Sequence, residues 1–81
     1  MTKIENLEHF TDLDEVYLSE NGIEKIEGLE NNTKLTILDL AYNKITLIEN
    51  VDHLLELNDL WVIIQFISGF GDGNLVQLFI H

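Results

Sequence analysis

The hydrophobic residues of this chain recur with a period of 22 residues. Residues 13–34 read LDEVYLSENGIEKIEGLENNTK, and residues 35–56 read LTILDLAYNKITLIENVDHLLE. Residues 4–12, IENLEHFTD, repeat the second half of such a block. A fixed period of this length indicates a repeat protein, in which each unit is a small coil of chain that packs against its neighbours. The apolar positions that coincide between the two full blocks are Leu13/Leu35, Val16/Leu38, Leu18/Leu40, Ile23/Ile45, Ile26/Ile48 and Leu29/Val51.

Each block predicts a strand, a turn and a returning segment. Its first residues follow the spacing LxxLxL, and this alternation is typical of a short strand with its leucines on one face. An asparagine follows the strand in both blocks, and its amide can bond backbone groups that a turn leaves unpaired. We therefore expect Asn21 and Asn43 to form a structural asparagine ladder. The returning segments EGLENNTK (27–34) and ENVDHLLE (49–56) are expected to form turns or short 3₁₀ segments on a convex side.

The full pattern, LxxLxLxxNxIxxIxxL, resembles that of leucine-rich repeats. The resemblance implies an α/β fold, a leucine-rich-repeat solenoid whose short parallel strands form a concave sheet. One coil cannot bury its hydrophobic face alone, so successive coils must stack and pair their strands in parallel. A pair of amphipathic helices is the competing interpretation. The Asn21-Gly22 dipeptide and the short alternating runs favour strands and turns instead.

The pattern also predicts where the coils lie. We expect a half coil at residues 1–12, full coils at residues 13–34 and 35–56, and the start of a third coil at residues 57–62. The remaining residues, 63–81, are interpreted as a degenerate coil or as an unrelated C-terminal segment.

Two residues in this last segment break the pattern. Gln65 stands where the asparagine belongs, and Gly73 stands where a leucine is expected. A truncated or alternatively spliced chain would end in this way. Solenoids usually need polar capping coils, and the sequence shows none at either end. We therefore expect the isolated chain to have low stability.

The stretch LSENGIEKIEGLENNTKLTILDLAYNKI (18–45) and the phrase LNDLW (57–61) are similar to repeats of the leucine-rich-repeat regulatory subunits of protein phosphatase 1. The resemblance covers about residues 1–62. It implies a partial or truncated member of that family, a non-catalytic regulatory subunit that docks on the phosphatase catalytic subunit and is found in nucleus and cytoplasm. Similar repeats occur in axonemal dynein light-chain and tubulin-associated proteins. A scaffold of the cytoskeleton or axoneme is therefore an alternative, as is a non-functional truncated isoform.

The composition narrows the choice of partner. The chain has 15 acidic residues against 4 lysines and no arginine, which gives a formal net charge of −11. Such a surface repels phosphate backbones, so nucleic acid is not expected as a partner, whereas a basic protein surface is attracted. The longest apolar run, Leu60 to Phe70, is too short to span a bilayer, which needs about 20 residues. No secretory signal is visible at the N-terminus.

No feature of the sequence indicates an enzyme, and we expect no cofactor and no small-molecule substrate. The chain has no cysteine, which excludes disulfides and thiolate metal sites. His9 and His53 fall at equivalent places in different coils and have no converging partners, so no metal site is expected.

The binding residues are expected on the outward face of the strands. Alternation places nine residues there, which are Glu15, Tyr17, Ser19, Ile37, Asp39, Ala41, Asp59, Trp61 and Ile63. Aromatic side chains are frequent binding hot spots, and carboxylates pair with basic groups of a partner. We therefore predict that the partner-binding residues are Glu15, Tyr17, Asp39, Asp59 and Trp61. The resemblance implies phosphatase contacts at Asp39, Asp59 and Trp61. The open alternatives are that Trp61 packs beneath the C-terminal segment and that the aspartates are ordinary solvated strand residues.

Overall fold

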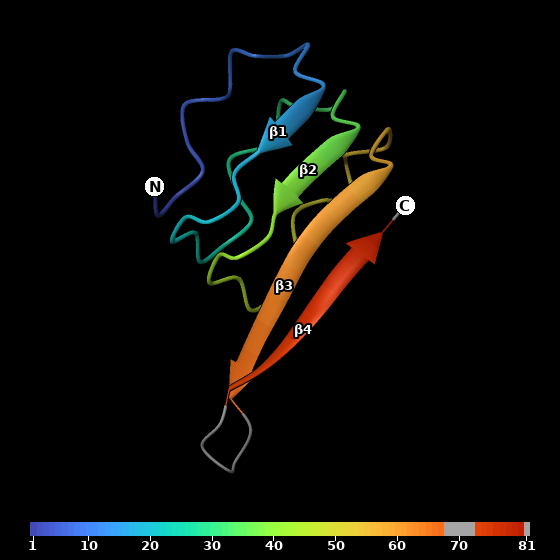
Figure 1. Cartoon of the computed structure of the whole chain (residues 1–81). Helices are drawn as coiled ribbons and strands as arrows, with labels where there is room; N and C mark the ends of the chain where they lie inside the picture. The colour runs from blue at the N-terminus through green and yellow to red at the C-terminus, as the bar shows by residue number, and fades with distance from the viewer. Residues whose placement is uncertain (68–72, 81) are drawn as a thin grey trace.

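The computed structural model describes the backbone of residues 1–67 and 73–80 and the side chains of residues 1–63. Four strands form one sheet in the order β1-β2-β3-β4 (Figure 1). They are β1 (Glu15–Tyr17), β2 (Ile37–Leu40), β3 (Asp59–Ile67) and β4 (Gly73–Ile80). The first three strands run parallel, and β4 runs antiparallel to β3. The prediction of parallel strands at the start of each block is confirmed.

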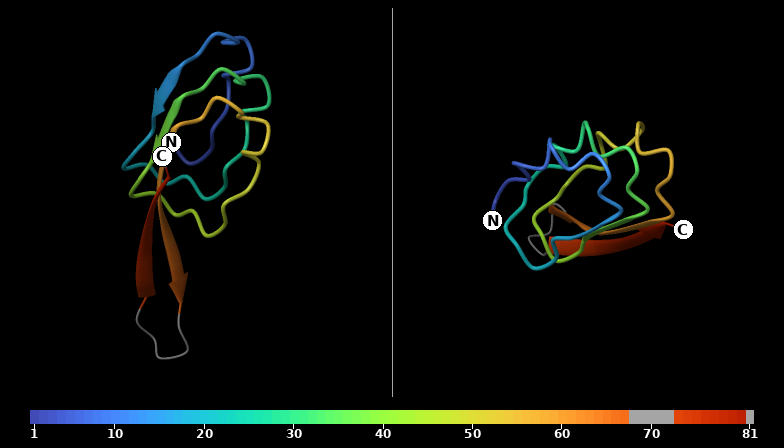
Figure 2. Two further views of the ribbon diagram at one scale, coloured as in Figure 1. Left: turned by 90° about the vertical axis from the view of Figure 1, so that its right-hand side faces the viewer. Right: turned by 90° about the horizontal axis from the view of Figure 1, so that it is seen from above.

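Between one parallel strand and the next, the chain returns through turns behind the sheet, and the returns lie one above another (Figure 2). Turns occupy residues 8–9, 30–31 and 52–53, which are spaced 22 residues apart. A second set occupies residues 11–12, 33–34 and 55–56 with the same spacing. No helix occurs in residues 1–67 and 73–80. Of the two forms predicted for the convex side, the structure therefore has turns.

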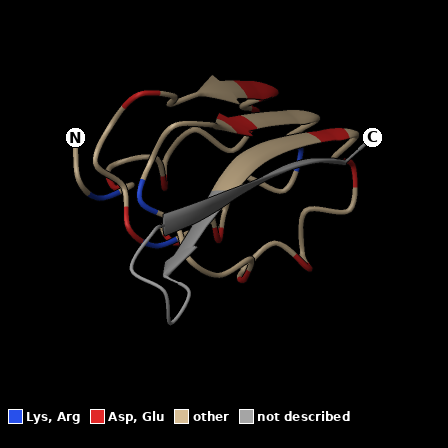
Figure 3. Cartoon of the chain, turned by 60° about the horizontal axis from the view of Figure 1, so that its bottom comes forward, with Lys and Arg blue, Asp and Glu red and all other residues tan. Residues whose placement is uncertain are grey.

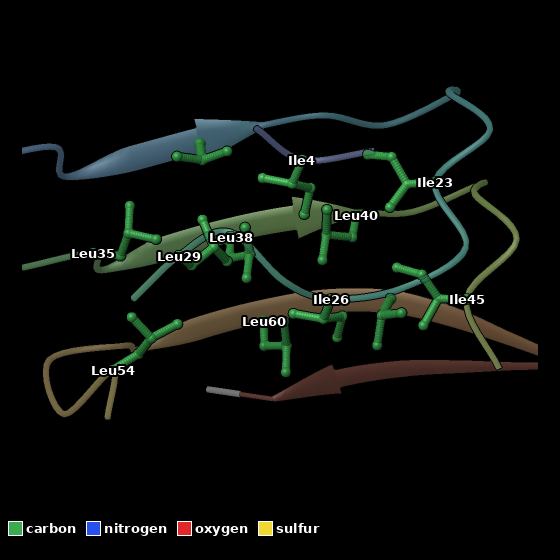
Figure 4. Packing of buried hydrophobic residues seen from close by; sticks show 12 residues of the cluster. Ile4, Ile23, Ile26, Leu29, Leu35, Leu38, Leu40, Ile45, Leu54 and Leu60 are labelled. Atoms are coloured by element: carbon green, nitrogen blue, oxygen red, sulfur yellow. The ribbon is translucent and has the colours of Figure 1, made fainter. Parts of the chain in front are cut away.

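The core lies between the strands and the returning segments. Leu38 and Leu40 of β2 point inward from the sheet, where they meet Ile23, Ile26 and Ile45 from the returns (Figure 4). All five side chains are completely buried. Burying a side chain of this size stabilises a fold by about 1.5–3 kcal/mol. The coinciding apolar positions of the two blocks are all part of this core, either buried or packed against it, as the 22-residue pattern predicted.

The strand register repeats the sequence period. Glu15 pairs with Ile37, which pairs with Asp59, and Tyr17 pairs with Asp39. Each of these partners is 22 residues further along the chain. Because every coil has the same length, equivalent residues lie side by side on neighbouring strands, which are about 4.8 Å apart in a sheet.

The sheet also contains an element that the repeat pattern did not predict. β3 continues for nine residues, past the point at which the earlier strands end, and β4 pairs along it from Leu60↔Ile80 to Ile67↔Gly73. The far part of this hairpin projects beyond the stacked coils (Figure 2). The predicted C-terminal segment, residues 63–81, thus contains the second half of β3 and all of β4. Residues 68–72 and 81 of that segment lie outside the described residues.

Two residues that alternation placed on the outward face are buried instead, so the prediction is wrong for Ala41 and Ile63. Ala41 is only 4% exposed because β2 ends at Leu40 and the chain is already turning, with the Ala41 amide donating to the Asp39 carboxylate at 3.1 Å. Ile63 is 7% exposed and lies in the part of β3 where Gln77 of β4 pairs beside it. Neither residue is available to a partner.

Candidate protein-binding face

The outward face of the sheet carries two rows of residues, each crossing β1, β2 and β3. We call Tyr17, Asp39 and Trp61 the central row, because Tyr17 pairs with Asp39 and Asp39 pairs with Trp61. We call Glu15, Ile37 and Asp59 the flanking row, which lies two residues earlier on the same strands. The structure therefore places all five predicted binding residues on three adjacent strands.

The two aromatic side chains of the central row are open to solvent. Tyr17 is 60% exposed and Trp61 is 39% exposed, whereas Asp39 between them is partly buried. Tyrosine and tryptophan bury large areas on association and lose little conformational freedom, since each has few rotatable bonds. Two such groups on either side of a carboxylate form a surface with both apolar area and negative charge.

Negative charge gathers around Tyr17. Its hydroxyl donates to Glu15 Oε1 at 2.6 Å. This hydrogen bond raises the pKa of Tyr17 above its ordinary value, and the carboxylates of Glu15, Asp39 and Asp59 raise it further. Carboxylates from all three parallel strands therefore act on the one phenol of Tyr17.

The lysines lie elsewhere. Acidic residues occur on all three parallel strands, and the four lysines all lie outside the strands (Figure 3). Lys34 pairs with Asp12 of the preceding coil at 2.8 Å. The Lys34 ammonium lowers the pKa of Asp12, and the Asp12 carboxylate raises the pKa of Lys34. The candidate face is therefore acidic, and one of the lysines forms an ion pair between coils.

Besides contributing negative charge to the central row, the Asp39 carboxylate stabilises the turn after β2. Its Oδ1 accepts the backbone N–H of Ala41 at 3.1 Å, directly after β2. This bond holds the carboxylate in place and helps the chain to turn. A substitution that removes the oxygen would disturb the turn, so the charge of Asp39 has to be tested by a variant that keeps an acceptor.

The side chain of Asn43 joins two successive coils just beyond the ends of β1 and β2. Asn43 Oδ1 accepts the backbone N–H groups of Asn21 at 3.1 Å and of Ile23 at 3.2 Å. A side-chain amide thus bridges two coils and satisfies backbone groups that a turn leaves without partners. The Nδ2 group of Asn43 donates to the carbonyl oxygens of Leu18 at 2.9 Å, Leu40 at 3.0 Å and Ala41 at 3.3 Å.

Further contacts between coils were not predicted. Asn50 Nδ2 donates to Ile26 O at 2.7 Å, His53 Nε2 lies 2.8 Å from Leu29 O, and the completely buried Asn32 donates to Leu7 O and Phe10 O.

Asn6, Gly28 and Asn50 all have a positive φ, of 67°, 77° and 60°. These three are 22 residues apart, and asparagine and glycine are the residue types that adopt this conformation most readily. The 22-residue spacing of Asn6, Gly28 and Asn50 was the signal in the sequence that could have identified this shared backbone conformation.

The returning side of the molecule carries hollows lined by charged residues. A shallow hollow of about 340 Å³ is lined by Lys3 and by acidic residues of two coils. In the part of the chain that the structure describes, no group of three or more His, Cys, Asp or Glu residues could hold a metal ion. Within the same residues, no helix has the length and apolar character needed to cross a bilayer.

Coils of equal length and strands in parallel register define a repeat protein, and its sheet carries an exposed row of aromatic and acidic groups. The family model described as Leucine Rich repeats (2 copies) matches residues 11–54, which is more than half of the chain. The chain belongs to the leucine-rich-repeat family. Such repeats are typically non-catalytic protein-interaction modules, and the match indicates no family of enzymes. None of the curated proteins compared with the chain matches it.

Proposed function

We propose that the chain is a protein-binding module that docks on the catalytic subunit of protein phosphatase 1 in the nucleus and cytoplasm. In this proposal its coils are part of a leucine-rich-repeat solenoid, and the central and flanking rows lie on the concave side. The observation that carries the proposal is the register Tyr17↔Asp39↔Trp61, which gathers two exposed aromatic groups and a carboxylate on adjacent strands.

The chemistry of the face favours a basic protein surface. Lysine and arginine side chains pair with carboxylates and also stack on aromatic faces, and both groups occur here within two rows. The net charge of −11 steers a basic partner toward the molecule and disfavours nucleic acid and anionic membrane surfaces. The resemblance of residues 1–62 to phosphatase regulatory repeats supports the phosphatase catalytic subunit as the partner. A small-molecule substrate is not part of the proposal.

The test is a titration of purified phosphatase catalytic subunit against the full 81-residue chain, followed by calorimetry or biolayer interferometry. Trp61→Ala is expected to raise the dissociation constant at least about tenfold, because truncation of a hot spot costs about 2 kcal/mol or more of binding free energy. Leu55→Ala is the matched control, since Leu55 is 87% exposed but lies outside both rows. A dissociation constant that Trp61→Ala leaves unchanged would contradict the proposed face.

The charge of the central row is tested separately. Asp39→Asn removes the negative charge and keeps an oxygen that can accept the Ala41 N–H, so the turn is preserved. We expect slower association and a weaker dependence of the rate on salt, because charge steering is screened over about 10 Å at 0.1 M salt. Glu24→Gln removes one charge from an exposed position outside the rows and serves as the control. Equal effects of the two variants would mean that only total charge matters.

A further inference from the structure

The two ladder asparagines differ in the residue that follows each of them. Asn21 is followed by Gly22, and Asn43 is followed by Lys44. We propose that Asn21 is a site of spontaneous covalent modification, in which its side-chain amide is converted to a carboxylate through a cyclic imide. The proposal is independent of the identity of the binding partner.

The reaction is balanced by the chain itself and solvent water. The backbone nitrogen of Gly22 attacks Cγ of Asn21, and a new N–Cγ bond forms while the Cγ–Nδ2 bond breaks. The Gly22 amide proton leaves with the departing nitrogen as ammonia. Water then opens the five-membered imide to give either an aspartate or an isoaspartate at position 21. Glycine favours this attack because it has no side chain that would hinder the ring or restrict its backbone, and the two reacting groups belong to adjacent residues.

The side-chain amide of Asn43 is held by more hydrogen bonds than that of Asn21. The Oδ1 atom of Asn43 accepts two backbone N–H groups of the preceding coil, at 3.1 and 3.2 Å. The Oδ1 atom of Asn21 instead meets the terminal amino group of Met1 at 3.4 Å, in an exposed position. A carboxamide must rotate before its Cγ can be attacked, and the amide of Asn43 has to break more bonds than that of Asn21 to do so.

The N-terminal residues control access to the reacting groups. The Gly22 N–H donates to Met1 O at 2.8 Å, and Nδ2 of Asn21 donates to Leu18 O at 3.0 Å and to Ser19 O at 3.2 Å. The attacking nitrogen is therefore occupied while the first residues are in place. Reaction requires these residues to detach, so the rate of modification reports how often the N-terminal half coil opens.

The product would oppose closure of the turn. A carboxylate oxygen in place of Nδ2 faces the carbonyl oxygens of Leu18 and Ser19, so that two hydrogen bonds become contacts between acceptors. An isoaspartate also lengthens the backbone by one carbon, four residues after the end of β1. The modification thus loosens the turn next to Tyr17, and it is not reversed by the reaction that forms it.

The experiment follows the folded full-length chain during incubation at mildly alkaline pH, by proteolytic digestion and mass spectrometry. The exchange of NH₂ for OH is located by fragmentation, and isoaspartate is distinguished from aspartate by retention time. We expect modification at Asn21 to be at least about tenfold faster than at Asn43, which corresponds to about 1.4 kcal/mol of activation free energy. Equal rates at Asn21 and Asn43 would overturn the proposal.

Two variants separate the effect of the residue after each asparagine on the modification rate from the effect of the folded structure. Gly22→Ala slows the attack, and its added Cβ would make only ordinary contacts, 3.4 Å to Thr2 Cγ2 and 3.7 Å to Met1 O, so the fold is retained. Lys44→Gly gives Asn43 the same neighbour as Asn21, and in the folded chain Asn43 should remain the slower of the two. An unchanged rate in Gly22→Ala, or an Asn43 as fast as Asn21 in Lys44→Gly, would overturn the proposal. Unfolding in urea should bring the two sites of the Lys44→Gly variant to similar rates.

Discussion

Strands β2 and β3 begin alike and end differently. Both enter the sheet at equivalent places in the repeat, since Ile37 of β2 pairs with Asp59 of β3. β2 ends at Leu40, and Asn43 turns the chain back toward the core. β3 passes straight through the equivalent position, Gln65, and ends at Ile67.

The backbone hydrogen bonds of the two regions are completed in different ways. After β2, one side-chain amide bonds carbonyl oxygens of its own coil and N–H groups of the preceding coil. Along the far half of β3, a second strand supplies the partners, from Ile63↔Gln77 to Ile67↔Gly73. An asparagine at this position thus allows the chain to leave the sheet, because its short amide replaces the ladder bonds that a strand would otherwise need.

The largest effect is expected from removing that amide. Asn43→Ala would remove the acceptor of the Asn21 and Ile23 N–H groups and the side-chain donor to Leu40 O. Leu18 O and Ala41 O would each keep one other donor, Asn21 Nδ2 and the Glu20 N–H. We expect a loss of about 3 kcal/mol in the free energy of unfolding, as each unsatisfied buried group costs about 1–3 kcal/mol and water partly compensates at this half-exposed site. Chemical denaturation followed by circular dichroism measures it.

Two further variants make this prediction specific. Asn43→Gln copies the residue found in β3, and its extra methylene should prevent the amide from reaching both coils, with a loss of about 2 kcal/mol. Asn31→Ala is the control, because the exposed amide of Asn31 donates to Glu8 O and should contribute less than about 1 kcal/mol. If Asn43→Gln is as stable as the wild type, the length of the amide is not what distinguishes the two strands.

Substitution of Gly28 should also lower the free energy of unfolding. The φ of Gly28 is +77°, and a Cβ at this position would clash with the carbonyl oxygen of Ile4. Gly28→Ala should therefore destabilise the chain by about 2 kcal/mol, through backbone strain and a clash with the preceding coil. Thermal unfolding measures the loss. Gly22→Ala, where the contacts are ordinary, should change the midpoint little, and similar losses at the two glycines would contradict this explanation.

A smaller effect is expected from placing asparagine in β3. Gln65 pairs with Leu75 of β4, so Gln65→Asn puts a residue that strands disfavour into an existing ladder. We expect the hairpin to persist with a loss of about 0.5 kcal/mol. Amide hydrogen exchange of β4 is the measurement. A complete loss of protection in β4 would show that asparagine alone is sufficient to end the strand.

The smallest effect concerns ionisation on the binding face. Because the folded-state pKa of Tyr17 is raised, its contribution to stability is present below pH 10.0, the ordinary value, and is lost as the pH rises through the folded-state pKa. Glu15→Ala removes the hydrogen-bonded carboxylate and should lower the pKa of Tyr17 toward that value. Titration of phenolate absorbance, with Tyr42→Phe to remove the second tyrosine, measures the shift. A midpoint that Glu15→Ala leaves unchanged would mean that the hydrogen bond is not the main cause.

The period of the sequence was sufficient to predict the parallel strands, their register and the inward apolar positions. This follows because coils of equal length must align equivalent residues, which is why Tyr17, Asp39 and Trp61 form one row. The burial of Ala41 and Ile63 could not be predicted in the same way. Alternation describes a strand only while the strand continues, and it contains no information on where a turn begins or which other strand lies nearby.

The 22-residue pattern could not predict β4 for a similar reason. Antiparallel pairing with β3 is a contact between segments that share no repeat, and no periodic signal in the sequence marks it. The individual bonds between coils, such as those of Asn32 and His53, were also missed, since polar residues in returning segments look like ordinary solvent-exposed positions. The candidate face was accessible to prediction because it depends on register alone.

The orientation of β4 gives the sheet two unlike borders. A coil of the repeated type presents a parallel strand, and the border of β3 at which such a strand would pair is occupied by the antiparallel β4. The border at β1 has the parallel geometry of the repeat. The parallel pairing of the repeat can therefore continue beside β1, whereas beside β3 the antiparallel β4 takes its place.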